Sequence, residues 1–115
     1  MGFHTFYVRY EKGNEKVDNE VIKTELVSIA KKHKFVVKDK TSMSELLVKP
    51  TEKEFAFTCD KTLTSFQHWW KGGEKGMTKD AQSLAWEIEQ YLLKDGKCKI
   101  NFIYLQYSAG VPDIL

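Results

Sequence analysis

The sequence predicts a single two-layer α+β domain over residues 1–115, with helices on one face of a mainly antiparallel sheet. Aromatic and β-branched runs typical of strands occur at residues 4–10, 54–59 and 97–108. Two stretches with helical apolar spacing lie between them, at about residues 19–34 and 78–95. The resulting chain order predicts a ferredoxin-like, split βαβ arrangement with an extra short helix.

The first third of the chain predicts a strand followed by a helix. HTFYVRY, residues 4–10, is apolar on both alternating faces, as expected of a central strand. Asp18 is the predicted N-cap, and Val17 is expected to pack on Ile22 as a hydrophobic staple. The helix is expected to reach about Lys34. Its buried stripe consists of Ile22, Leu26, Ile29 and Ala30, with His33 on the same side.

The middle of the chain predicts a hairpin and a short helix. FVVKD, residues 35–39, is expected to form an edge strand, and SELLVK is expected to pair with EFAFTC across a turn at Pro50. TLTSFQHWW, residues 62–70, then predicts a short helix with Leu63, Phe66 and Trp70 on one side. The glycines of GGEKG end it.

The last third predicts the longest helix and the closing strand. Thr78 is the expected N-cap, and Gly96 the expected left-handed cap beyond the helix end. The apolar stripe of this helix is Ala81, Leu84, Ala85, Ile88, Tyr91 and Leu92. In the final strand, we expect Ile100, Phe102 and Tyr104 on one face, and Ile103, Leu105 and Tyr107 on the other. One face of the sheet is then expected to be open.

Composition excludes several classes of protein. Two cysteines are too few for a disulfide framework, no apolar run approaches the length of a membrane span, and no leader peptide is evident. We therefore expect a cytoplasmic protein. The net charge of +2 includes a lysine-rich segment at residues 31–40, which suits a solvated helix end.

Neither a metal site, a cofactor site nor a catalytic constellation is predicted. The three histidines, His4, His33 and His68, share no spacing that a zinc site uses. GGEKG lacks the order of a phosphate-binding loop. A small enzyme built on Cys59 and His68 remains an alternative, although a cysteine that alternates with phenylalanines in a strand is typical of a core.

Tryptophans supply the candidate recognition surface. If Trp70 fills the core, Trp69 must point sideways or outward, next to His68. Helical steps of about 100° place Trp86 and Leu93 together, away from the main apolar stripe. Because tryptophan is enriched at interface centres, His68, Trp69, Trp86 and Leu93 are the predicted partner-binding residues. Trp86 and Leu93 are equally compatible with self-association.

Two strand segments point to a different partner. KEFAFTC, residues 53–59, and FYVRY, residues 6–10, resemble the third-strand and first-strand motifs of RNA recognition motif domains. The resemblance implies that Tyr7, Phe55 and Phe57 stack on bases from an open sheet face, with Lys53 near the phosphates.

The preferred function is a non-enzymatic protein-binding domain. In its lysine-rich, single-domain character the chain resembles bacterial immunity proteins, which implies an inhibitor that neutralises a toxin or enzyme encoded nearby. The positive net charge favours a partner with an acidic or mixed surface. A single-stranded RNA-binding module and a small Cys/His enzyme are the alternatives.

Overall fold

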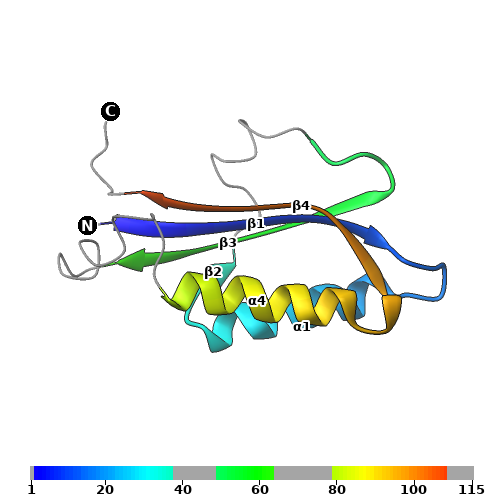
Figure 1. Ribbon diagram of the computed structural model, residues 1–115, viewed down its shortest axis with the longest axis horizontal. Helices are drawn as coiled ribbons and strands as arrows, with labels where there is room; N and C mark the ends of the chain where they lie inside the picture. The colour runs from blue at the N-terminus through cyan, green and yellow to red at the C-terminus, as the bar shows by residue number, and fades with distance from the viewer. Residues whose placement is uncertain (1, 38–48, 64–78, 109–115) are drawn as a thin grey trace.

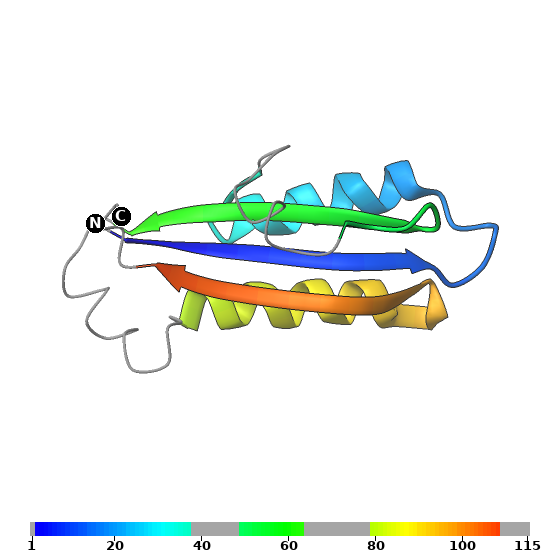
Figure 2. The ribbon, with the colours of Figure 1, turned by 90° about the horizontal axis from the view of Figure 1, so that it is seen from above.

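A computed structural model describes residues 2–37, 49–63 and 79–108. Its elements are β1 (Gly2–Lys12), α1 (Asn19–Lys32), β2 (Val36–Val37), β3 (Glu54–Leu63), α4 (Lys79–Leu93), the 3₁₀ turn η1 (Lys94–Gly96) and β4 (Cys98–Ser108). The sheet has the order β2-β3-β1-β4, and all neighbouring strands are antiparallel. Both long helices lie on one side of the sheet (Figure 1), α1 under the β3 side and α4 under the β4 side (Figure 2). The predicted two-layer α+β architecture is confirmed at this level.

β1 is a central strand, as its two apolar faces predict. Phe6, Val8 and Tyr10 point towards the helices and are buried in the core. Their cross-strand partners on β3 are Cys59, Phe57 and Phe55 respectively, so these residues share the helix side of the sheet.

α1 begins and packs as its local sequence predicts. The carboxylate of Asp18 accepts a hydrogen bond of 2.9 Å from the backbone N–H of Glu20, which caps the helix. The stripe of Ile22, Leu26, Ile29 and Ala30 is buried. The helix ends at Lys32, two residues before the predicted end, because Lys34 takes a positive φ of 68°.

β3 is longer than predicted. Thr62 and Leu63, expected to open a short helix, continue the strand because they pair with Phe3 and Gly2 of β1. The rest of that predicted helix, residues 64–70, lies outside the described residues, as do most of SELLVK and the GGEKG loop. In the described part of the chain, β2 is the strand that pairs with β3 on its other side.

α4 and β4 confirm the last predicted helix and strand, with one correction. Ala81, Leu84, Ile88 and Leu92 are buried, and Gly96 has the left-handed φ of 65° expected of a cap. In β4, Ile100 pairs with Tyr10 while Phe102 pairs with Arg9, so Asn101 is an extra residue in a β-bulge. The bulge turns Ile100 to the helix side, where it packs against the core. The prediction that Ile100 shares a face with Phe102 and Tyr104 is wrong for this reason.

Candidate protein-binding surface

Trp86 and Leu93 are large apolar side chains that the fold leaves exposed. Trp86 is 64% exposed and Leu93 is 48% exposed, although both lie on a helix whose other side fills the core. They are seven residues apart, so they lie on one side of α4, separated by about two turns. We call this pair the α4 patch.

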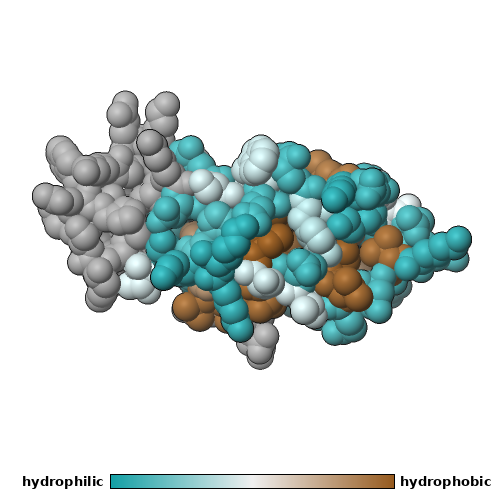
Figure 3. All heavy atoms as spheres, turned by 90° about the horizontal axis from the view of Figure 1, so that it is seen from below, coloured by the Kyte–Doolittle hydropathy of each residue, from teal (hydrophilic) through white to brown (hydrophobic). Residues whose placement is uncertain are grey.

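The α4 patch faces away from both the sheet and α1. The buried stripe of α4 faces the sheet, and Glu87 faces α1, where its carboxylate contacts the side chains of Lys32 at 2.7 Å and His33 at 2.8 Å. Trp86 and Leu93 are turned by about 100–120° from Glu87 around the helix, so neither faces α1. Figure 3 views this helix-covered side and shows apolar areas between hydrophilic ones.

α4 is held firmly on its other sides. At its N-terminal end, Lys61 Nζ of β3 lies 2.5 Å from Oδ2 of Asp80. Near its C-terminal end, Lys97 Nζ lies 3.5 Å from the ring centroid of Tyr91, a cation–π contact. The first contact joins the helix to β3, and the buried stripe of α4 packs it against the sheet.

The other two predicted partner-binding residues, His68 and Trp69, lie outside the described residues, as does Trp70. The structure therefore brings together Trp86 and Leu93 and leaves the prediction for the tryptophan pair open.

The predicted RNA-binding residues do not share one surface. Phe57 is buried on the helix side, and Phe55 packs there against Tyr10 with a ring-centroid distance of 5.7 Å. Tyr7 lies on the opposite side of the sheet, since successive side chains of a strand point to opposite faces. The expectation that Tyr7, Phe55 and Phe57 form one stacking surface is therefore wrong. Phe57 belongs to the core, and Phe55 packs against it.

A different aromatic group lies on the sheet face opposite the helices. Tyr7 packs edge-on against Phe102 with ring centroids 6.0 Å apart, and Phe102 stacks with Tyr104 at 6.2 Å. Tyr104 is 37% exposed, whereas Tyr7 is only 3% exposed. The alternation of Phe102 and Tyr104 in the sequence indicates that these two share a face of the sheet. Their contact with Tyr7 could not be predicted in this way, because it depends on the pairing of β4 with β1.

A charged network borders this aromatic group. Arg9 Nε donates a hydrogen bond of 3.1 Å to Glu54, and its guanidinium lies 5.3 Å from the ring centroid of Phe102. The side-chain amide of Asn101 donates to both Glu54, at 2.6 Å, and Glu11, at 2.9 Å. A hydrogen bond from the backbone N–H of Thr51, and then the one from Asn101, lower the pKa of Glu54. Arg9 is thus held by a carboxylate that stays ionised.

Both cysteines are buried in the core. Cys59 is fully buried and Cys98 nearly so. Burial in apolar surroundings raises the pKa of both thiols, and the neighbouring Asp60 adds to the effect on Cys59. The reactive form of a cysteine is the thiolate, which this environment disfavours.

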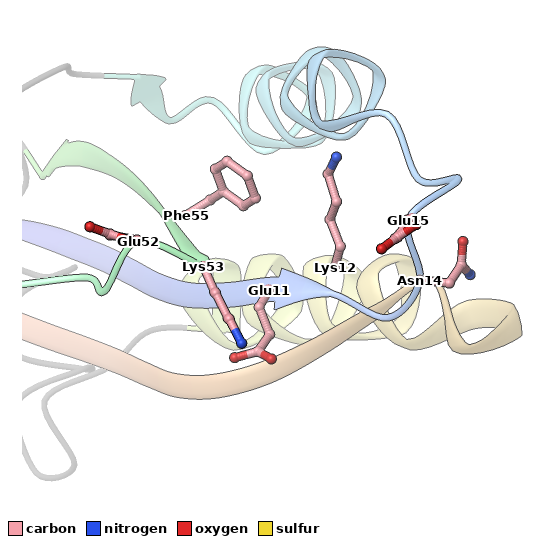
Figure 4. A pocket seen from close by; sticks show the side chains of 7 residues that line it. All are labelled: Glu11, Lys12, Asn14, Glu15, Glu52, Lys53 and Phe55. Carbon is pink, nitrogen blue, oxygen red and sulfur yellow. The ribbon is translucent and has the colours of Figure 1, made fainter.

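One pocket of about 410 Å³ lies at the end of the sheet where β1 leads into α1. Figure 4 shows that Lys53 points towards Glu11, whereas Lys12 and Glu52 point away from this pair. Phe55 forms an apolar part of its wall. In the described residues, no group of three or more His, Cys, Asp or Glu side chains is arranged to hold a metal ion.

Comparisons with protein-family models, curated proteins and solved structures gave no significant match to this chain. Within the described ranges, no helix combines the length and the apolar character needed to cross a membrane.

Proposed function

We propose that this protein is a non-enzymatic protein-binding domain that acts by occupying the surface of a partner, as an inhibitor or an immunity-type protein does. The observation that carries the proposal is the exposure of Trp86 and Leu93 on one side of α4. Exposed tryptophan lowers solubility, and tryptophan is the residue type most enriched at the energetic centres of protein interfaces.

The way α4 is held supports the same function. A binding surface on a rigid element loses little conformational freedom when a partner docks, so more of the contact energy becomes affinity. Glu87, Tyr91 and Asp80 make the contacts of α4 with its neighbours. None of these contacts covers Trp86 or Leu93. With a net charge of +2, the chain is better suited to a partner whose surface is acidic or mixed.

We further propose that the fold is ferredoxin-like. Support comes from the two helical connections: β1–α1–β2 passes across β3, and β3–α4–β4 passes across β1. Each connection thus has one strand between the two that it joins, which is the split βαβ pattern.

The environment of Cys59 counts against the Cys/His enzyme. A nucleophilic cysteine needs access to substrate and a stabilised thiolate, whereas Cys59 is fully buried and its thiol pKa is raised.

A second candidate function is single-stranded RNA binding on the sheet face opposite the helices. It is favoured by the stacked pair Phe102 and Tyr104 and by the guanidinium of Arg9 beside it. The carboxylates of Glu11 and Glu54 next to Arg9 weigh against it, because they repel phosphates. Salt-dependent binding of a fluorescent single-stranded RNA, weakened by Tyr104→Ala and unchanged by Trp86→Ala, would favour this candidate.

The protein-binding proposal is tested by capture followed by reconstitution. The tagged wild type, Trp86→Ala and Val21→Ala are each used to capture proteins from the native source. Val21 is an exposed apolar residue on α1 and serves as the matched control. We expect a protein that the wild type and Val21→Ala retain and Trp86→Ala loses. When that protein is purified, its own activity should fall on addition of the wild type. Equal capture by all three variants would reject the α4 patch as the binding site.

A further inference from the structure

β4 forms one edge of the sheet over most of its length. It pairs with β1 on one side, and no strand of the described residues pairs with its other side. An unpaired edge exposes backbone N–H and C=O groups that favour pairing with another strand. The opposite edge differs in its residues: β2 covers only Cys59 and Asp60 of β3, and β3 itself carries charged residues.

Between Ile100 and Tyr107, β4 also lacks the charged residues and prolines that often protect an edge. From Ile100 to Tyr107 it contains no charged residue, no proline and no glycine, and six of the eight residues are aromatic or aliphatic. Lysine and proline are the common protective residues on edge strands. β1 and β3, the two inner strands, each contain charged residues, among them Arg9 and Glu11 in β1 and Asp60 and Lys61 in β3.

The composition of β4 makes a second copy of this chain a suitable occupant. When identical strands pair antiparallel, each residue meets one from the same short segment, and like charges that lie opposite each other destabilise the pair. β4 has no charge between Ile100 and Tyr107, so self-pairing meets no such repulsion. Its aromatic and β-branched side chains are those that stabilise cross-strand pairs.

The bulge at Asn101 places the pairing in the second half of the strand. Bulges bend a strand and disrupt regular pairing at an edge. Beyond it, Phe102–Ser108 pairs without interruption with Arg9 to Phe3 of β1, so this half is regular. We propose that two copies of the chain pair antiparallel through the outer edges of their Phe102–Ser108 segments and join their sheets into one.

This dimer goes beyond the proposed function, because its contacts are made by the backbone edge of the sheet and do not depend on the exposure of Trp86. The two-fold axis of such a pair is perpendicular to the sheet, so both helix layers lie on the same side. The two α4 helices, one under each β4, would then lie on that side, next to each other across the axis.

Sedimentation equilibrium of the full chain tests the proposal against Tyr104→Lys and Val36→Lys. Tyr104 is exposed, so lysine fits there and adds a like charge to both paired strands. Val36→Lys makes the same kind of change at the opposite edge of the sheet. We expect twice the chain mass of 13.4 kDa for the wild type and Val36→Lys. For Tyr104→Lys we expect a weaker dimer, with a Kd that is roughly tenfold higher or more.

Isotope-filtered NMR of a mixed labelled and unlabelled wild-type sample provides a test that needs no variant. Intermolecular contacts between backbone protons of Phe102–Ser108 in the two copies are the expected result. A monomer at all concentrations, or a dimer whose intermolecular contacts lie elsewhere, would overturn the proposal. Neither result would bear on partner capture through Trp86, so the two proposals fail separately.

Discussion

The Nε2 atom of His33, at the C-terminal cap of α1, lies 2.8 Å from Oε1 of Glu87 in the middle of α4. The other carboxylate oxygen of Glu87 accepts a hydrogen bond of 2.7 Å from Lys32. One carboxylate therefore joins the two helices.

Glu87→Gln should destabilise the fold in a pH-dependent way. The hydrogen bond from Lys32, and then the one with His33, lower the pKa of Glu87. A carboxylate whose pKa is lower in the folded chain adds stability above its unfolded pKa and loses it as the pH falls through its folded pKa. We expect Glu87→Gln to lower the free energy of unfolding by about 0.5–1 kcal/mol at neutral pH. The difference from wild type should shrink as the pH falls below the ordinary glutamate pKa.

Urea unfolding of the wild type and Glu87→Gln across this pH range provides the measurement. Glu89→Gln, on the other flank of the same helix, is the control and should change stability less. An equal loss of unfolding free energy at neutral and acidic pH would show that the charge of the Glu87 carboxylate does not stabilise the fold.

Gly13→Ala should destabilise the protein more than Gly96→Ala. The backbone N–H of Gly13 donates a hydrogen bond of 2.7 Å to the carbonyl of Lys97, and a Cβ at position 13 would clash with the carbonyl oxygen of Gly96. We expect a loss of about 2–3 kcal/mol from this clash. At Gly96 there is open space, so only the left-handed backbone is strained, at about 1 kcal/mol. Thermal unfolding of both variants checks the order, and a reversed order would contradict the close approach.

Cys59 and Cys98 should react slowly with thiol reagents in the native state. Both are buried, and burial raises the pKa of both thiols. At neutral pH the native protein should show almost no titratable thiol, and denaturant should reveal two. Fast reaction of Cys59 without denaturant would instead support the hypothesis of an enzyme built on Cys59 and His68.

Tyr10→Phe should weaken the connection between β1 and α1. The Tyr10 hydroxyl donates a hydrogen bond of 2.9 Å to Oδ1 of Asn19, the first residue of α1. Its loss should reduce the free energy of unfolding by about 0.5–1.5 kcal/mol. In a double-mutant cycle with Asn19→Ala, the double mutant should lose less stability than the sum of the two single-mutant losses. Fully additive losses would show that the hydroxyl stabilises the fold by another route.

Helix positions could be predicted from the sequence because their signals are local. The Asp18 cap, the buried stripe of α1 and the buried stripe of α4 all follow from spacing within one segment. The same spacing put Trp86 and Leu93 together, apart from the buried stripe, and the structure leaves both exposed.

Features that depend on pairing between distant segments could not be predicted. The extension of β3 through Thr62 depends on its partner Phe3, and the turn of Ile100 to the core depends on a bulge against β1. The contact of Glu87 with His33 joins residues that no local pattern relates. The same limit explains why Phe57 was placed on a recognition face: alternation shows that a strand has two sides, but not which side the helices cover.

The affinity of a reconstituted complex for Trp86→Ala, measured by calorimetry beside Val21→Ala, tests the central claim most directly. The α4 patch predicts that Trp86→Ala weakens binding by about 2 kcal/mol or more, roughly 30-fold in Kd, while Val21→Ala binds as the wild type does. A partner that binds the wild type and Trp86→Ala with equal affinity would contradict the claim that this exposed tryptophan is the centre of the binding surface.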